Sequence, residues 1–123
     1  MNLTSIVNKL YFQPRRRELE RYINEGEAIQ HEILQYLIKR GKDTEYGRNH
    51  LFYTINSYED FVQNIPVNTY EELKGDIDRM RHGEKDILWP GQVKWYAKSS
   101  GTTNDKSKFI PITEEGLQSL HYQ

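Results

Sequence analysis

The chain has 123 residues, a formal net charge of −1, a hydrophobic fraction of 36% and a charged fraction of 28%. This composition suits one small domain with a modest core, and the charge gives no electrostatic basis for binding nucleic acid. The absence of cysteine excludes disulfides, zinc–thiolate sites and thiol nucleophiles. No apolar run approaches the roughly 20 residues of a membrane span, and the N-terminus does not resemble a signal peptide, so we expect a cytoplasmic protein.

Two amphipathic helices are predicted at the start of the chain. Apolar residues at helical spacing predict a short helix over residues 3–12, and Pro14 suits the first turn of a second helix over about residues 14–40. Gly26 lies within the apolar stripe of the second helix, where it predicts the close approach of another backbone. We interpret Arg15–Arg17 as a solvated helix face rather than as a binding patch.

Three shorter helical segments are expected next. Thr44–Arg48 predicts a single helical turn, and residues 49–56 are interpreted as a loop. Two helices are predicted to begin at Ser57 and Thr69, because each hydroxyl is followed three residues later by an acid that completes a capping box. Pro66 ends the first of these helices. The acids and arginines within the second helix are interpreted as a solvated face.

The last third of the chain predicts a β-hairpin. Residues 93–98 alternate, with Val93, Trp95 and Ala97 on one face of a strand and Lys94, Tyr96 and Lys98 on the other, and residues 109–112 form the partner. Because Pro111 cannot donate to a ladder, this partner is an edge or irregular strand. A final helix begins after it. The preceding Trp-Pro-Gly sequence, residues 89–91, is interpreted as a turn with an aromatic anchor.

The fold class is therefore an α+β fragment, mostly α-helical with one β-hairpin. We expect residues 1–88 to form a helical segment, and residues 89–123 to form the hairpin, its loop and the start of a helix. No metal site is predicted, because the histidines are not paired at metal-ligand spacing. These histidines are His31, His50, His82 and His121.

The loop between the two strands has an unusual composition. Residues 99–103 contain four hydroxyl side chains and one glycine, and two lysines follow. Small residues let main-chain N–H groups turn inward, and such a loop suits a phosphate, although the same composition also fits an exposed turn. Residues 101–107 also fall one residue short of a Walker A motif. We reject that interpretation because Asp105 replaces the glycine and the loop leads into a strand.

These residues carry a resemblance to a known family. Ser99-Ser100-Gly101-Thr102-Thr103 followed by Lys108 resembles the phosphate-binding loop of the adenylate-forming enzymes, the luciferase and acyl-CoA synthetase superfamily. The order and spacing of further motifs are similar to the plant auxin- and jasmonate-conjugating acyl-acid amido synthetases and their bacterial relatives. These motifs are Thr44–Gly47, Phe61 with Ile65–Pro66, Tyr70–Glu72, Ile77–Met80 and Gly83–Glu84.

The resemblance implies that the chain is the N-terminal portion of the large α/β domain of a longer ligase. Such an enzyme activates a carboxylic acid with ATP as an acyl-AMP and transfers the acyl group to an amino acid, with Mg²⁺ accompanying ATP. Lys106 is the alternative to Lys108, because residues 104–107 depart from the superfamily's pattern. The implied ATP-phosphate ligands are Ser99, Ser100, Gly101, Thr102, Thr103 and Lys108.

Two other functions are consistent with the sequence. One is an acyl-CoA synthetase, in which a thiol replaces the amine as the acceptor. The other is a helical interaction module without catalytic activity. We assign no catalytic residue to the chain itself and expect it to be inactive alone. We also expect it to self-associate through exposed apolar helix faces, with no nucleic-acid or membrane partner.

Overall fold

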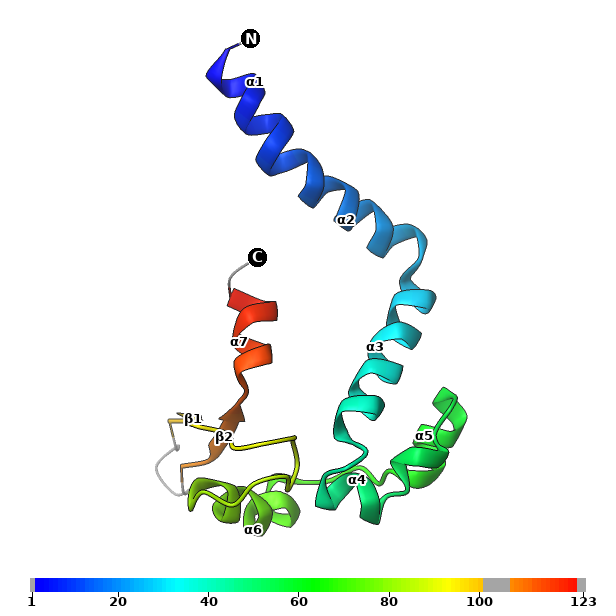
Figure 1. Cartoon of the computed structure of the whole chain (residues 1–123), viewed down its shortest axis with the longest axis vertical. Coiled ribbons are helices and arrows are strands. Elements are labelled where there is room, and N and C mark those ends of the chain that lie inside the picture. The colour runs from blue at the N-terminus through cyan, green and yellow to red at the C-terminus, as the bar shows by residue number, and fades with distance from the viewer. Residues whose placement is uncertain (1, 101–106, 122–123) are drawn as a thin grey trace. The chain divides into compact units, whose positions relative to one another are not determined.

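The computed structural model describes residues 2–100 and 107–121, with side chains described as far as Gln118. The chain forms two compact units, residues 1–36 and 37–123, and the boundary falls inside helix α3 (Gly26–Gly41). Helices dominate both units, and the strands described form one hairpin, so the predicted fold class is confirmed (Figure 1).

The first unit begins with three helical elements that follow one another without a break. These are α1 (Leu3–Val7), the π-helical turn η1 (Asn8–Phe12) and α2 (Gln13–Asn24). Pro14 lies in the first turn of α2, as predicted, but α2 is not separated from the helix before it. Proline lacks the N–H that an α-helix needs, and the wider π turn directly before Pro14 lets the helix continue through it.

The predicted helix over residues 14–40 is divided instead at Glu25. This residue has φ −126° and ψ 27°, outside the helical region, and separates α2 from α3. A Cβ added at Gly26 would meet no described atom within 4 Å, so the predicted close approach of another backbone is wrong. Asn24 and Gly26 are both poor helix formers, which accounts for a break at this point.

In the second unit the last turns of α3 lead into α4 (Glu45–Asn49), which confirms the predicted helical turn. Thr44 caps α4 and is only 1% exposed. Its hydroxyl accepts a hydrogen bond from the Gly47 N–H at 3.0 Å and donates one to the Gly41 carbonyl at 2.6 Å. This one side chain therefore links the end of α3 to the first turn of α4.

Two further helices follow, each begun by a capping box. In α5 (Tyr58–Asn64) the box is formed by Ser57 and Asp60, and in α6 (Tyr70–Arg81) it is formed by Thr69 and Glu72. Both predicted helix starts are confirmed. The predicted loop before them contains a short 3₁₀ helix, η2 (Phe52–Thr54).

The core of the second unit lies where α6 meets the segment after it. Met80, Ile87 and Val93 are buried together, and Tyr96 and Trp89 pack against them. The main-chain N–H groups of Glu45 and Tyr46 donate to the carbonyls of Asp86 and Ile87, at 2.7 and 3.0 Å. These bonds tie the N-terminus of α4 to this segment and satisfy donors that an isolated helix would leave unpaired.

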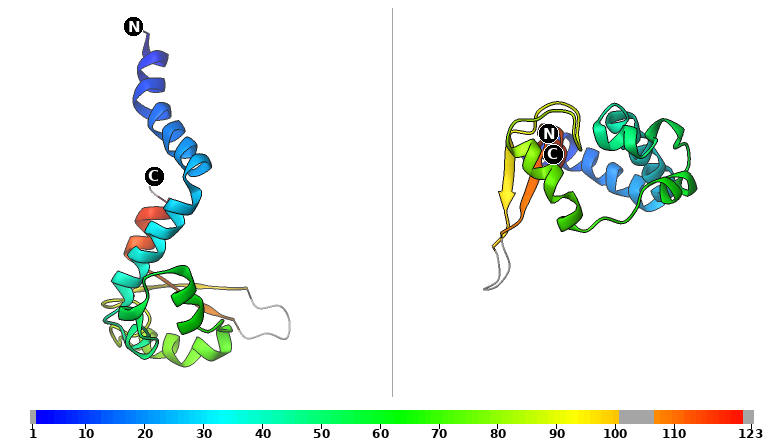
Figure 2. Two further views of the ribbon diagram at one scale, coloured as in Figure 1. Left: turned by 90° about the vertical axis from the view of Figure 1, so that its right-hand side faces the viewer. Right: turned by 90° about the horizontal axis from the view of Figure 1, so that it is seen from below.

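The hairpin consists of β1 (Trp95–Lys98) and β2 (Phe109–Ile112), which lie side by side in both views of Figure 2. The strands are antiparallel, with Tyr96 opposite Pro111. Val93 of the predicted apolar face is buried in the core, but within β1 it is Tyr96 that packs on the core, while Trp95 is 46% exposed. Helix α7 (Glu114–His121) follows β2, and Arg40 near the end of α3 bonds to Glu115 of α7 through its Nε at 3.3 Å.

Candidate phosphate-binding loop and its supports

The structure describes the two ends of the candidate loop. Ser99 and Ser100 follow β1 directly, and Lys108 directly precedes β2. The predicted ligands Gly101, Thr102 and Thr103, together with the alternative lysine at position 106, lie outside the described residues. What the structure describes of the site is therefore its stem, which consists of the residues Ser99 and Lys108 at the two ends of the loop.

Ser99 and Lys108 close this stem. The Ser99 N–H donates to the Lys108 carbonyl at 2.9 Å, and the Lys108 N–H donates to Ser99 Oγ at 3.0 Å. The predicted ligand Ser99 therefore has a second role, because its oxygen accepts a bond that holds the loop ends together. Its hydroxyl hydrogen remains able to donate to a ligand.

The hydrogen-bond pattern between β1 and β2 determines in which direction the main-chain N–H of Phe109 points. Hydrogen-bonded pairs alternate with non-hydrogen-bonded pairs in an antiparallel sheet, so the bonded pair at Ser99 and Lys108 places Phe109 and Pro111 at non-bonded positions. Their main-chain nitrogens point away from β1. Pro111, which has no N–H, fits at such a position without the loss of a hydrogen bond between the strands. The Phe109 N–H, in contrast, needs a hydrogen-bond acceptor from outside the sheet.

Helix α6 supplies that partner. The Phe109 N–H donates to the hydroxyl of Tyr70, the first residue of α6, at 2.9 Å. The Lys108 Nζ lies 5.6 Å from the centroid of the same Tyr70 ring. One aromatic side chain therefore contacts both the main chain at the start of β2 and the ammonium group of the candidate phosphate ligand.

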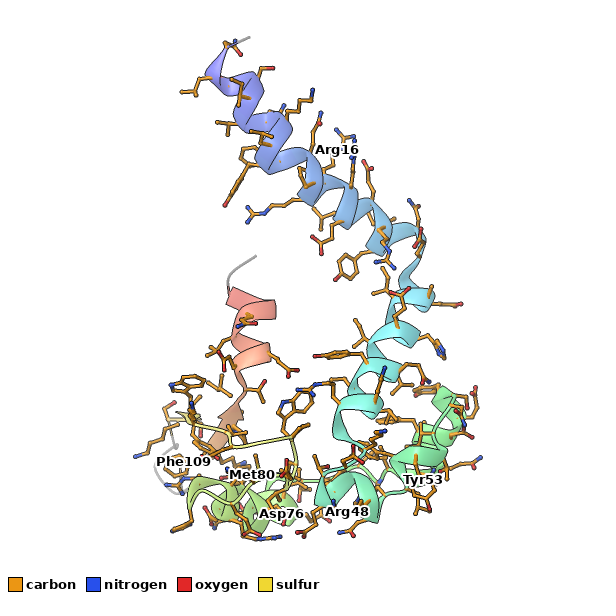
Figure 3. All side chains as sticks on the ribbon, viewed as in Figure 1. Arg16, Arg48, Tyr53, Asp76, Met80 and Phe109 are labelled. Atoms are coloured by element: carbon orange, nitrogen blue, oxygen red, sulfur yellow. The ribbon has the colours of Figure 1, made fainter. Side chains whose placement is uncertain are left out.

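The other end of α6 also contacts Phe109. The Arg81 guanidinium carbon lies 3.6 Å from the centroid of the Phe109 ring, within the range of a cation–π contact. Figure 3 shows Phe109 at the hairpin, beside α6. Asp78 accepts a hydrogen bond from Arg81 Nη1 at 3.1 Å and so holds the guanidinium in place. The first and last residues of α6 thus both contact Phe109.

Arg79 connects α6 to α4 through a cluster of carboxylates. It donates two hydrogen bonds to Glu45, at 2.8 and 2.9 Å, and two to Glu84, at 2.5 and 2.9 Å. Asp76 accepts a further bond at 3.2 Å. These bonds with the Arg79 guanidinium hold the pKa values of Glu45 and Glu84 below their ordinary range and raise the pKa of Arg79.

The predicted solvated face is partly exposed, with the Arg79 and Arg81 side chains 38% and 34% exposed, but both arginines also contact residues of other elements. Their partners are remote in sequence, since Glu45 lies 34 positions from Arg79 and Phe109 belongs to the hairpin. Sequence reasoning also missed the role of Tyr70, whose hydrogen-bond partner is 39 positions away. The only signal for these residues was that Tyr70 and Arg79 fall inside motifs of the resembled family.

The turn at residues 89–91 is confirmed. Gly91 has φ +77°, and its N–H donates to the Asp86 carboxylate at 2.6 Å. Trp89 packs on the core, as expected of an aromatic anchor, and the Arg40 guanidinium lies 5.8 Å from its ring centroid. A cavity of about 350 Å³ lies beside this turn, between it and the start of α7.

Within residues 2–100 and 107–121, no group of three or more metal-binding side chains was found. The Nδ1 atoms of His50 and His82 each lie within hydrogen-bond distance of a carbonyl four residues earlier, at 2.9 and 2.7 Å. In the same part of the chain, none of the helices combines the length and apolar character needed to cross a bilayer.

Comparison with known families gives a match over most of the chain. The model described as "GH3 family N-terminal domain" matches residues 15–123. Indole-3-acetic acid-amido synthetase GH3.15 of Arabidopsis thaliana is 34% identical over 101 residues, which cover 81% of this chain and 17% of that protein. Indole-3-acetic acid-amido synthetase GH3.5 of the same plant is 31% identical over 100 residues, which cover 80% of this chain and 16% of that protein.

A solved structure gives the same result. The structure titled GH3.15 acyl acid amido synthetase superimposes with a TM-score of 0.74 at 33% identity. The match covers 84% of this chain and 19% of that chain. The 123 residues thus span about a sixth of the length of the curated relatives that they match.

Proposed function

Because the chain belongs to the GH3 family, we propose that it forms the N-terminal part of an adenylate-forming ligase that joins a carboxylic acid to an amino acid. The observation that carries the proposal is the match in sequence and structure to amido synthetases over more than four-fifths of the chain. The names of these relatives, which are amido synthetases, favour an amine over a thiol as the acceptor.

The reaction proceeds in two steps. A carboxylate oxygen of the acid attacks the α-phosphorus of ATP, the bond to the bridging oxygen breaks, and pyrophosphate leaves. The amine of the amino acid then attacks the acyl carbon, and AMP leaves as the amide forms. Both steps depend on holding and neutralising phosphate oxygens, which is the task that we assign to this chain. Mg²⁺ enters with ATP and is held mainly by the phosphate oxygens.

The loop over residues 99–108 is the proposed phosphate ligand. Hydroxyls from Ser99, Ser100, Thr102 and Thr103 donate to phosphate oxygens, Gly101 allows close approach of the backbone, and Lys108 supplies the positive charge. The paired main chains of Ser99 and Lys108 support this role, because they bring the two ends of the loop together. We expect the chain to be inactive without the remainder of the ligase.

The test is carboxylate-dependent exchange of labelled pyrophosphate into ATP by the full-length protein that contains this chain. Indole-3-acetic acid is the first probe, followed by a panel of aromatic and aliphatic acids. We expect Lys108→Ala to lower exchange by about 100-fold, the effect of removing one group that stabilises transition-state charge. Lys106→Ala is the matched control and should change it by less than about 3-fold.

Each outcome has one meaning. A larger effect of Lys106→Ala than of Lys108→Ala would move the lysine assignment to position 106. If the wild-type protein catalysed exchange with none of the acids tested, the proposed ligase activity would be overturned. Exchange by residues 1–123 alone would contradict the expectation that the chain needs the rest of the protein.

A further inference from the structure

We propose that Tyr70 and Arg81 are positioning residues that hold the start of β2, and so aim Lys108 at the phosphates of ATP. Neither residue is proposed to touch the substrate. This inference rests on the proposed function, because it assigns a support to the loop that binds ATP there. It adds two side chains from α6 to a site otherwise made from the hairpin.

The first argument concerns the main chain of β2. The strand is four residues long, and its described partner is β1, so pairing alone orders it weakly. The register turns the Phe109 N–H away from β1, and the Tyr70 hydroxyl accepts it at 2.9 Å. Phe109 is only partly exposed, so an N–H without this partner would be costly. The Tyr70 hydroxyl therefore fixes the main chain one residue after Lys108.

The second argument concerns the Lys108 side chain itself. Its Nζ lies 5.6 Å from the Tyr70 ring centroid, so the ring attracts the ammonium and restricts its rotamers. A lysine side chain has four rotatable bonds and loses much entropy when it is fixed. A ring that restricts it before ATP binds reduces that cost. Tyr70 thus orients both the backbone and the charge of the candidate ligand.

The third argument concerns Arg81, which holds Phe109 from the opposite end of α6. Its guanidinium stacks on the Phe109 ring at 3.6 Å and is itself fixed by Asp78 at 3.1 Å. A planar guanidinium can stack on a ring in a way that a lysine ammonium cannot. The two ends of a twelve-residue helix thus hold one residue between them, which limits both shift and twist of the strand.

The experiment is a double-mutant cycle in the full-length protein, read by pyrophosphate exchange. Tyr70→Phe removes the hydroxyl and keeps the ring. We expect it to lower kcat/KM for ATP by about 10-fold, because small misplacements of a catalytic group cost this much or more. The KM for the carboxylic acid, which the loop is not proposed to contact, should change by less than about 2-fold.

The cycle separates positioning from general stability. If Tyr70 acts through Lys108, then Tyr70→Phe should change exchange by less than about 2-fold when Lys108→Ala is already present. A purely structural role would lower exchange by the same factor in both backgrounds. Tyr58→Phe is the matched control, because Tyr58 is also the first helical residue after an N-cap but is 65% exposed.

Arg81→Lys provides a second variant that retains the charge. We expect about a 3-fold loss of kcat/KM for ATP, with the thermal unfolding midpoint changed little. Equal effects of Tyr70→Phe in both backgrounds, or wild-type kinetics of Tyr70→Phe and Arg81→Lys, would overturn this inference and leave the ligase proposal standing. Absence of exchange by the wild-type protein would overturn both.

Discussion

Among the glycines that the structure describes, Gly47 leaves the least room for a Cβ atom. A Cβ added at Gly47 would lie 2.0 Å from the Gly41 carbonyl oxygen and 2.9 Å from its carbonyl carbon. Both atoms belong to backbone that is also held by the Thr44 hydroxyl. The first turn of α4 can therefore approach the end of α3 only because position 47 has no side chain.

Gly47→Ala is expected to destabilise the chain by about 3 kcal/mol, near the upper end of the usual cost of overpacking. Gly75→Ala is the matched control. Gly75 lies inside α6, and a Cβ there meets no described atom within 4 Å. Alanine at this helix position should stabilise by about 0.5–1 kcal/mol. Urea unfolding of the two variants checks both signs, and equal midpoints would contradict the steric argument.

Tyr70 shows why the remote contacts of a residue escape sequence analysis at this scale. Its position at the start of α6 follows from the N-cap residue Thr69. Its hydrogen bond to Phe109 follows only from where the hairpin lies. A tyrosine in the first turn of a helix has no sequence feature that predicts a partner 39 positions later.

At the scale of elements, the capping boxes were predictable, and the stability that they contribute depends on pH. The Thr69 N–H donates to the Glu72 carboxylate at 2.6 Å, and this bond holds the pKa of Glu72 below its ordinary value of 4.5. The Asn56 and Ser57 N–H groups lower the pKa of Asp60 in the same way. A carboxyl whose pKa is lowered by folding stabilises the fold above its unfolded pKa.

This stabilisation is lost as the pH falls from about 4.5 through the lowered pKa of Glu72. Glu72→Gln should therefore be less stable than the wild type near neutral pH, with a difference that shrinks below about pH 4. Urea unfolding at a series of pH values measures this difference. Glu71→Gln, which changes the neighbouring acid outside the box, is the control. A difference that stays constant from pH 7 to 3 would contradict the role of the ionised carboxylate.

The π turn has a consequence for the apolar residues of the first unit. At about 100° per residue, the group Leu19, Tyr22 and Ile23 would lie about 150° around a regular α-helix from the group Leu3, Val7 and Leu10. The additional residue of the π turn rotates the second group back by about 100°. The two groups therefore lie within about 50° of each other and form one apolar stripe.

At the scale of the whole molecule, this stripe gathers several exposed apolar side chains along one unit. No described residue of α1, η1 or α2 is buried, and Leu3, Leu10 and Ile23 are 77%, 73% and 81% exposed. Large exposed apolar surfaces favour association. We therefore expect the 123-residue chain to associate with itself as its concentration rises.

Sedimentation velocity over a series of concentrations checks this expectation. Leu10→Lys should shift association to concentrations about 10-fold higher, because it places a charge in the stripe. Val67→Lys is the control, since Val67 is 99% exposed but lies between α5 and α6. A monomer at every concentration, or equal effects of the two lysines, would contradict association through the stripe.

The sequence by itself determined the features that depend on neighbours within about four residues. The capping boxes at Ser57 and Thr69 and the turn at Gly91 follow from bonds or backbone angles local to the chain. The break at Glu25 is also local, but it escaped prediction because helix propensities differ by only about 1 kcal/mol.

Only the tertiary structure decided which surfaces meet. It placed Tyr96 rather than Trp95 on the core, joined Arg79 to Glu45, and brought Tyr70 and Arg81 to Phe109. Periodicity gives the spacing of side chains along an element, but it does not reveal which remote element covers a face. The contacts of Tyr70 and Arg81 with Phe109, beside the candidate phosphate loop, were decided by the tertiary structure because each joins residues from separate elements.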